Sequence, residues 1–399
     1  MPAKDRIFGL DLLRATAVLL VVFHHSLSFT AASTSLYAYG WLGEIGVGAL
    51  LVLSGYLIGQ GLIKKSKEGR FSKVQHLGQF YARRWSRTFP PYFFYLFIMA
   101  ALTPSFIHVL LTHKLYFFFL QNFAWDPPPF YCQTWTLALL EFFYLLFPLL
   151  LLLTSKFVRN YLVCLFIPMA LLFLIPLVLR ALHTQIEPPD RFEETFRKWV
   201  VFRIDTPIIG VAAAVVQAEL PLVWAWLLHR SWIGLCTFSS VMLYHYLGCP
   251  HLYSNHWIQV FFHPFSALML APLLPFLCNW KINTSIFGTM MSTISQTSYS
   301  LYVSHFFALI IGLCILTILG ISSDRWLITY PVYILLIALV TCPSYYLTEE
   351  PFIRLREAKS PSYFSAIRKF ASRTFSASFP PSSTGSDQPD RPLANAPRN

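Results

Sequence analysis

The stretch LDLLRATAVLLVVFHHSLSF, residues 10–29, indicates the class of fold. It matches the roughly 20 residues that an α-helix needs to cross a bilayer, yet it contains Asp11, Arg14, His24 and His25. A charged side chain at the bilayer centre costs about 2.5–3.5 kcal/mol even on the most lenient scale. Such side chains in a membrane-length segment are therefore candidates for a function.

Arg14 and His25 are eleven residues apart, or about three helical turns, so both side chains project from one face, roughly 16 Å apart along the axis. Asp11, three residues before Arg14, is expected to pair with it. Arg14 has two interpretations: it snorkels to the cytoplasmic interface, or it belongs to a site. His25 lies near the far end of the segment, where snorkelling to that interface does not explain it. His24 points about 100° away and is expected to be a bystander.

The composition of the whole chain indicates a membrane protein. Hydrophobic residues make up 56% of the 399 residues and charged residues 12%, whereas soluble domains average about 25% charged. Ten apolar segments are candidate spans: 10–30, 42–63, 90–111, 134–153, 160–180, 205–228, 231–248, 257–278, 298–319 and 327–347. The shorter segment 115–123 is expected to be re-entrant or interfacial. We predict an all-α polytopic membrane protein with about ten transmembrane helices.

The net charge of +12 comes from positive residues that concentrate in alternate loops, which argues against a nucleic-acid-binding surface. Lys4 and Arg6 precede the first segment, the loop 31–41 has no Lys or Arg, and the next loop has eight of them between residues 64 and 87. This alternation predicts that both termini are cytoplasmic. The loop 181–204 carries both signs and is expected outside, as a small lid.

We expect a transmembrane domain over residues 1–355. The tail 356–399 is rich in Ser and Pro, which predicts a cytoplasmic segment that is disordered towards its end. The seven Cys residues show no C-x-x-C spacing, and no metal is expected.

Arg84 and Arg87, within YARRWSRTFPPY at 81–92, form a second candidate group. They are three residues apart and share one face of a helix, just before the segment 90–111 on the cytoplasmic side. The spacing leaves two interpretations open. One is a positive flank attracted to anionic lipid headgroups. The other is an anion clamp, because the planar guanidinium matches phosphate oxygens in a bidentate manner.

In their order and spacing, the motifs resemble those of the acyltransferase-3 family of integral membrane acyltransferases, which modify envelope glycans in bacteria. The resemblance runs from about residue 9 to 352. It rests on GLDLLRATAVLLVVFHH (9–25), with Arg and His separated by ten residues, GVGALLVLSGYLI (46–58), RWSR (84–87) with Pro90 and Tyr92, LQNF (120–123), WTL (135–137), FYLLFP (143–148), SYSLYVSH (298–305) and EEPF (349–352).

Two positions depart from the family pattern. Gly48 stands where the second block often carries an acidic residue. Leu140 stands where the family has a glutamate, and Glu141 follows it, which turns the side chain by about 100°. Glu141 is still expected to face the interior, because a carboxylate facing lipid is costly. Gly55 is expected to permit a close approach of helices.

The resemblance implies the transfer of an acyl group, most often acetyl, from cytosolic acyl-CoA to a hydroxyl of an envelope glycan. His25 is the predicted base, acting directly on the hydroxyl or first accepting the acyl group as a nucleophile. Arg14 would hold part of the donor or stabilise negative charge, and Glu141 is a further catalytic candidate. Arg84 and Arg87 would bind the CoA phosphates.

His305 has two interpretations. It is a second proton carrier, or an interior histidine bonded to a helix backbone, and the structural role is favoured. Tyr299 and Tyr302 are expected to pack with their hydroxyls bonded to a neighbour.

The implied partners are the bilayer of the inner (plasma) membrane and an acceptor glycan or lipid-linked sugar, such as an O-antigen or other lipopolysaccharide sugar. A separate periplasmic partner stays open, and nucleic acid is not expected. The alternative function is a proton-coupled transporter or a glycan flippase, since intramembrane Arg, His and Glu also serve transport. No symmetry between two halves is visible, and transport leaves the cytoplasmic arginines unexplained.

Overall fold

The computed structural model describes residues 6–29, 41–68, 74–103, 106–183, 188–248, 255–281, 285–323 and 325–358. Every regular element in these ranges is helical. Internal contacts divide the chain into two units, Met1–Phe352 and Ile353–Asn399, and the helical bundle belongs to the first. The predicted tail beyond residue 358 lies outside the described residues, so the domain boundary at residue 355 stays a prediction.

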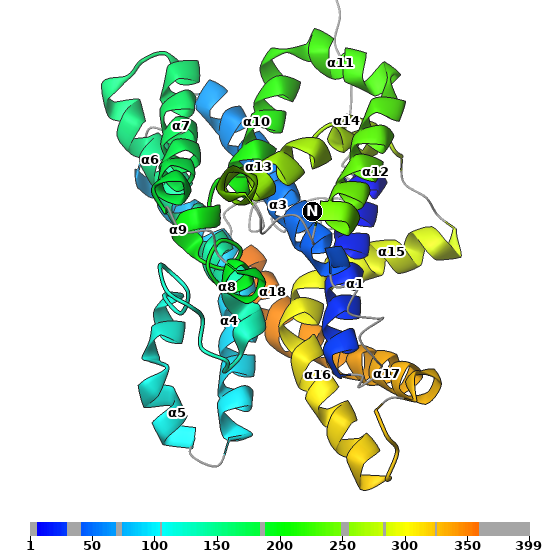
Figure 1. The fold of residues 1–399 in the computed structure, drawn as a ribbon. Coiled ribbons are helices and arrows are strands. Elements are labelled where there is room, and N and C mark those ends of the chain that lie inside the picture. The colour runs from blue at the N-terminus through cyan, green and yellow to red at the C-terminus, as the bar shows by residue number, and fades with distance from the viewer. Residues whose placement is uncertain are drawn as a thin grey trace, which may run out of the picture. The chain divides into compact units, whose positions relative to one another are not determined.

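The order of the helices along the chain can be followed in Figure 1. They are α1 (Phe8–Phe29), α3 (Trp41–Lys67), α4 (Val74–Ala101), α5 (Phe106–Thr112), α6 (Trp135–Phe157), α7 (Tyr161–Leu182), α8 (Pro189–Glu194), α9 (Val200–Arg203), α10 (Thr206–Glu219), α11 (Pro221–His229), α12 (Ser231–Gly248), α13 (His256–Leu270), α14 (Leu273–Cys278), α15 (Ile286–Gln296), α16 (Ser298–Ile318), α17 (Trp326–Ser344) and α18 (Glu350–Ala358). Short 3-10 turns at Lys114–Phe118 and Cys132–Thr134 precede α6, and a π-helical turn at Tyr345–Glu349 follows α17.

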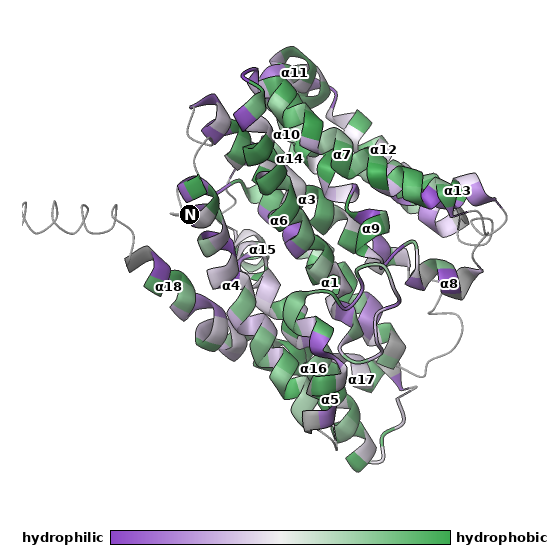
Figure 2. Ribbon diagram, turned by 90° about the vertical axis from the view of Figure 1, so that its left-hand side faces the viewer, coloured by the Kyte–Doolittle hydropathy of each residue, from purple (hydrophilic) through white to green (hydrophobic). Residues whose placement is uncertain are grey.

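Eight helical stretches in the described residues are long and apolar enough to cross a membrane, which confirms an all-α polytopic membrane protein. They are Phe8–Leu27, Trp41–Lys67, Cys132–Phe157, Tyr161–Leu182, Val200–Glu219, His256–Cys278, Ser298–Ile318 and Leu327–Arg356. Apolar residues dominate the ribbons of α6, α7 and α10, whereas hydrophilic residues mark α8 and α18 (Figure 2).

Two of the ten predicted segments are not among these eight. The predicted segment 231–248 forms α12, which is less apolar than these eight stretches. The predicted segment 90–111 was wrong in its bounds, because α4 begins at Val74, continues through the arginine-rich stretch and ends at Ala101. The predicted segment 205–228 is also broken, since α10 ends at Glu219 and Pro221 begins α11. Proline has no N–H group to continue the helical hydrogen bonds.

The helix α3 is central to the bundle and packs most extensively against α10 and α1. A Cβ atom at Gly55 would lie 1.8 Å from the carbonyl oxygen of Pro207, and one at Gly210 would lie 2.0 Å from that of Val52. The backbones of α3 and α10 therefore touch, which confirms the expected role of Gly55. The helix α1 also packs against α16, and α16 in turn packs against α4.

The loop expected to form a lid is packed into the bundle instead. Phe192 and Phe196 are buried in a cluster with two residues of α13. Arg197 and Arg203 lie 2.5 and 3.3 Å from the two carboxylate oxygens of Glu44 on α3. Buried aromatic rings and a buried carboxylate hold this part of the loop in place; residues 184–187 lie outside the described ranges.

Candidate active site

A pocket of about 910 Å³, a volume that includes its open mouth, lies between α1, α3, α4, α6 and α16. Four of the five predicted site residues line it: Arg14, Arg84, Arg87 and Glu141. Seven hydroxyl-bearing side chains also line the pocket: Ser54, Thr88, Thr136, Tyr144, Ser298, Tyr299 and Tyr302. The remaining wall is largely apolar and includes Val18, Val47, Leu50, Leu51, Leu57, Leu137 and Leu140.

Arg14 and His25 lie on one continuous helix, α1, as predicted. The predicted ion pair between Asp11 and Arg14 was wrong. Asp11 pairs with Arg6 at 2.7 Å and accepts a hydrogen bond of 2.7 Å from Ser295 Oγ. Arg6 lies just before α1 in the chain, and Ser295 lies on α15, which packs against α1. Asp11 is thus engaged elsewhere, and Arg14 lines the pocket.

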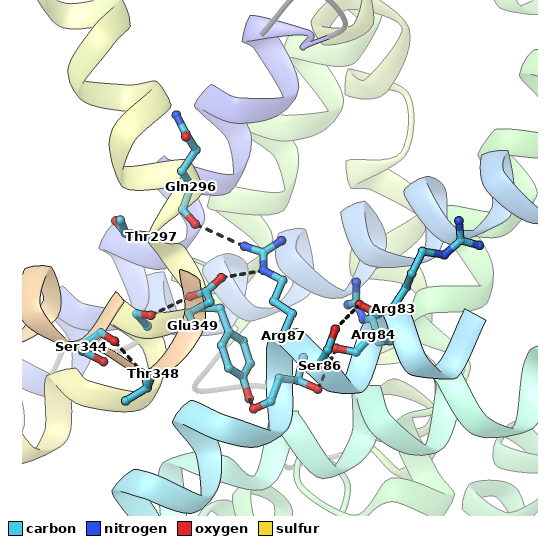
Figure 3. Close-up of polar contacts among 12 residues, drawn as sticks. Arg83, Arg84, Ser86, Arg87, Gln296, Thr297, Ser344, Thr348 and Glu349 are labelled. Atoms are coloured by element: carbon cyan, nitrogen blue, oxygen red, sulfur yellow. Dashed lines mark hydrogen bonds and ion pairs between the residues drawn. The ribbon is translucent and has the colours of Figure 1, made fainter. Parts of the chain in front are cut away.

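Arg87 is held in a defined orientation by groups from the C-terminal part of the bundle (Figure 3). Its Nε atom donates to Glu349 Oε1 at 2.6 Å, and its Nη2 atom donates to the carbonyl oxygen of Gln296 at 3.2 Å. Glu349 is fully buried, and its second oxygen accepts a hydrogen bond of 2.6 Å from Ser300 Oγ. Arg83 is exposed and points away from this cluster.

Arg84 packs on an aromatic ring of α6. Its guanidinium carbon lies 3.7 Å from the ring centroid of Tyr144, and its Nη2 atom donates to the hydroxyl of Tyr144. A cation over an aromatic face gains electrostatic attraction, which holds the guanidinium at the pocket wall.

Glu141 is buried and lines the pocket, so the expectation that it faces the interior is confirmed. Its Oε2 atom accepts a hydrogen bond of 3.1 Å from Trp85 Nε1 on α4. Leu140, at the position where the family has a glutamate, lines the same pocket. The two neighbouring positions therefore both reach it.

His25 is not part of the pocket lining and lies next to a second histidine. Its Nδ1 atom is 3.0 Å from Nε2 of His305, and the two ring centroids are 5.0 Å apart. His305 is fully buried, and its Nδ1 atom lies 2.7 Å from the carbonyl oxygen of Tyr302. The expected backbone bond of His305 is confirmed, and its contact with His25 was not anticipated.

Tyr302 connects the pocket with the two histidines. Its side chain lines the pocket, and its ring centroid lies 5.8 Å from that of His305. Its hydroxyl donates to the carbonyl oxygen of Gln133 at 2.7 Å, and the hydroxyl of Tyr299 donates to that of Thr88 at 2.7 Å. Both expected hydroxyl bonds are confirmed.

Sequence reasoning missed Glu349 as a member of the site. The available signal was its place in the EEPF block, at the end of an apolar segment where a buried carboxylate needs a partner. The π-helical turn Tyr345–Glu349 sets the direction of this side chain, and such turns are frequent at functional sites. In the described ranges no three His, Cys, Asp or Glu side chains gather as a metal site.

Comparison with known proteins finds similarity to a protein family and to a curated relative. A family model described as an acyltransferase domain (Acyl_transf_3) matches residues 7–349. The peptidoglycan O-acetyltransferase OatA of Listeria monocytogenes serovar 1/2a (strain ATCC BAA-679 / EGD-e) is 30% identical over 169 residues, which cover 38% of this chain and 25% of the relative. The match thus spans about a quarter of that relative. No solved structure matches the chain.

Proposed function

Because the chain belongs to the acyltransferase-3 family, and is therefore a membrane acyltransferase, we propose that it transfers an acetyl group from cytosolic acetyl-CoA to a hydroxyl of an envelope glycan. The family membership gives the reaction class. The donor, the acceptor and the location in the inner (plasma) membrane are parts of the proposal, as is the cytoplasmic side for both termini.

The observation that carries the proposal is the layout of the pocket. Three arginines, Arg14, Arg84 and Arg87, line it together with an apolar wall, and Tyr302 links it to His25 and its partner His305. A CoA thioester has the same polarity pattern, with phosphates at one end and a long, mostly uncharged arm that carries the acyl group. The phosphates would bind the guanidinium groups, and the arm would lie along the apolar wall.

The charges of the pocket also support an anionic donor. The lining carries three arginines and one acidic residue, Glu141, and a second carboxylate, that of Glu349, is bonded to Arg87. One positive charge is therefore left in excess, and it would attract a phosphate-bearing molecule. Glu141 accepts the hydrogen bond from Trp85 and so connects α6 to α4 at the pocket wall.

His25 would supply the base. In the direct route, a ring nitrogen of His25 takes the proton of the glycan hydroxyl while its oxygen attacks the thioester carbon. The C–S bond breaks, the ester forms, and the CoA thiolate leaves and takes up a proton. In the two-step route, the same nitrogen first attacks the thioester carbon, the C–S bond breaks, and the CoA thiolate leaves and takes up a proton, which gives an acyl-imidazole. The hydroxyl oxygen then attacks the acyl carbon, the C–N bond breaks, and the released imidazole takes the hydroxyl proton.

The acceptor is inferred by chemical class. The relative is named for O-acetylation of peptidoglycan, which is an envelope glycan. A sugar hydroxyl at the outer face is therefore the proposed acceptor, with lipopolysaccharide sugars such as O-antigen and peptidoglycan as the two cases to separate.

The test uses membranes that contain the full chain, acetyl-CoA labelled in the acetyl group, and either lipopolysaccharide or peptidoglycan as acceptor. We expect base-labile label in one glycan with the wild type, and a loss of about 100-fold or more with His25→Ala. His24→Ala, the neighbouring residue, is the matched control and is expected to retain activity. Full transfer by His25→Ala, at the same protein level as the wild type, would refute the assignment of His25 as the base. No transfer by a folded wild type, with proton flux in liposomes, would favour the transporter.

A further inference from the structure

We propose that His305 is a positioning residue that fixes the tautomer of His25, so that Nε2 of His25 is the reacting atom. This inference rests on the proposed function, because it assigns the nitrogen that takes the proton or the acyl group in that reaction. It is carried by the hydrogen bonds around the two rings.

The proton of His305 is located by its backbone partners. Its Nδ1 atom lies 2.7 Å from the carbonyl oxygen of Tyr302 and 3.3 Å from that of Leu301. Carbonyl oxygens only accept hydrogen bonds, so Nδ1 must carry the hydrogen. In a neutral imidazole the other nitrogen then has none and can only accept. The neutral form suits a fully buried ring whose side-chain partner is a second imidazole rather than a carboxylate.

The accepting nitrogen of His305 determines which ring nitrogen of His25 carries the hydrogen. Nε2 of His305 lies 3.0 Å from Nδ1 of His25, so Nδ1 of His25 must be the donor. A neutral His25 is then protonated at Nδ1 and keeps its lone pair on Nε2. Free histidine in water prefers the opposite tautomer, so this state needs a fixed acceptor such as the one that His305 supplies.

The arrangement resembles the way in which an aspartate orients the histidine of a serine protease, with one difference. A neutral imidazole brings no negative charge into a membrane-embedded site, where an unpaired carboxylate would be costly. When Nε2 of His25 takes a proton from the hydroxyl, its Nδ1–H still donates to His305. The carbonyl of Tyr302 polarises His305 in turn and so supports the charge.

The tautomer can be observed directly. The full chain, labelled with ¹⁵N-histidine and placed in lipid nanodiscs, gives nitrogen shifts that distinguish protonated from unprotonated ring positions, and His25→Ala identifies the signals of His25. We expect the wild-type His25 to carry its hydrogen on Nδ1. A wild-type His25 with its hydrogen on Nε2 would overturn the proposal, whatever the stability of the variants.

Kinetics separate positioning from packing. His305→Leu keeps much of the volume but has no acceptor, and we expect it to lower kcat by about 100-fold, with a KM for acetyl-CoA within a few-fold of the wild type. For comparison, the wrong tautomer costs about 10⁴-fold in a serine protease. His305→Gln has an amide oxygen that can accept from His25 Nδ1, and it should recover at least tenfold of that loss. Equal kcat values for the Leu and Gln variants would overturn the proposal.

Discussion

Arg87 and Glu349 are 262 positions apart in the chain and form an ion pair, with Nε of the arginine 2.6 Å from Oε1 of the carboxylate. The carboxylate is fully buried, while the arginine side chain is 33% exposed. Because Ser300 holds the other oxygen, Arg87 is fixed against α16 and the π-helical turn rather than free to extend towards lipid headgroups. This favours the anion-site interpretation of the arginines over the lipid-flank interpretation.

Removing one partner of this pair should cost more than removing both. Arg87→Met leaves the carboxylate of Glu349 buried without its cation. Breaking a fully buried pair in this way costs about 3–5 kcal/mol, and the partial exposure of Arg87 places the expected cost at or below the lower end of that range. The double variant Arg87→Met/Glu349→Gln should regain part of that loss, because no buried charge is left unpaired. Thermal unfolding in detergent measures both, with the exposed Arg83→Met as the control. A double variant less stable than Arg87→Met would contradict this account.

Arg84 should act on donor binding. A hydrogen bond to a charged group contributes about 1.5–3 kcal/mol, so Arg84→Ala is expected to raise the KM for acetyl-CoA by roughly 10- to 100-fold with a small effect on kcat. Arg84→Lys should recover only part of this, since lysine lacks the planar fork. Initial rates at varied acetyl-CoA measure it, and the exposed Arg83→Ala should behave like the wild type. An unchanged KM in Arg84→Ala would favour the lipid-flank interpretation.

Local periodicity accounts for the parts of the site that sequence reasoning predicted. The spacing of Arg14 and His25 requires only one unbroken helix, and α1 provides it. Arg84 and Arg87 share a face because they are three residues apart on α4, and both line the pocket. Gly55 is also a local signal, because a glycine in an apolar helix indicates close packing.

Contacts between distant segments could not be predicted in this way. The partners of His25 and Arg87 lie 280 and 262 positions away, and only the packing of α16 and the π-helical turn brings them together. Asp11 had a plausible neighbour in Arg14, yet a residue of α15 and an arginine before the helix engage it. The start of α4 was misplaced because the prediction followed the apolar run, which marks only the part suited to the membrane. The helix itself begins earlier and continues through the charged residues before that run.

A second buried pair should stabilise the bundle strongly. Arg180 of α7 and Asp205 before α10 are both fully buried, with Nη2 2.5 Å from Oδ2, and Arg180 Nε donates to Val260 O of α13 at 3.0 Å. Arg180→Met should lower the free energy of unfolding by about 3–5 kcal/mol, because it leaves a buried carboxylate unpaired. The control is Arg191→Met, which removes a pair whose side chains are 50% and 37% exposed and should cost at most about 1 kcal/mol. Similar unfolding temperatures of the two variants would contradict this ranking.

Two glycines of α3 test the contact with α10. A Cβ atom at Gly55 would meet the carbonyl oxygen of Pro207 at 1.8 Å, whereas one at Gly61 would meet nothing within 4 Å. Gly61→Ala should therefore be neutral or stabilise by up to about 1 kcal/mol, through helix propensity alone. Gly55→Ala must push α10 away, which lowers the unfolding temperature. It should also lower activity, because Leu51 and Ser54 of the same helix line the pocket. Equal unfolding temperatures for the two alanine variants would show that the contact between α3 and α10 is looser than the structure has it.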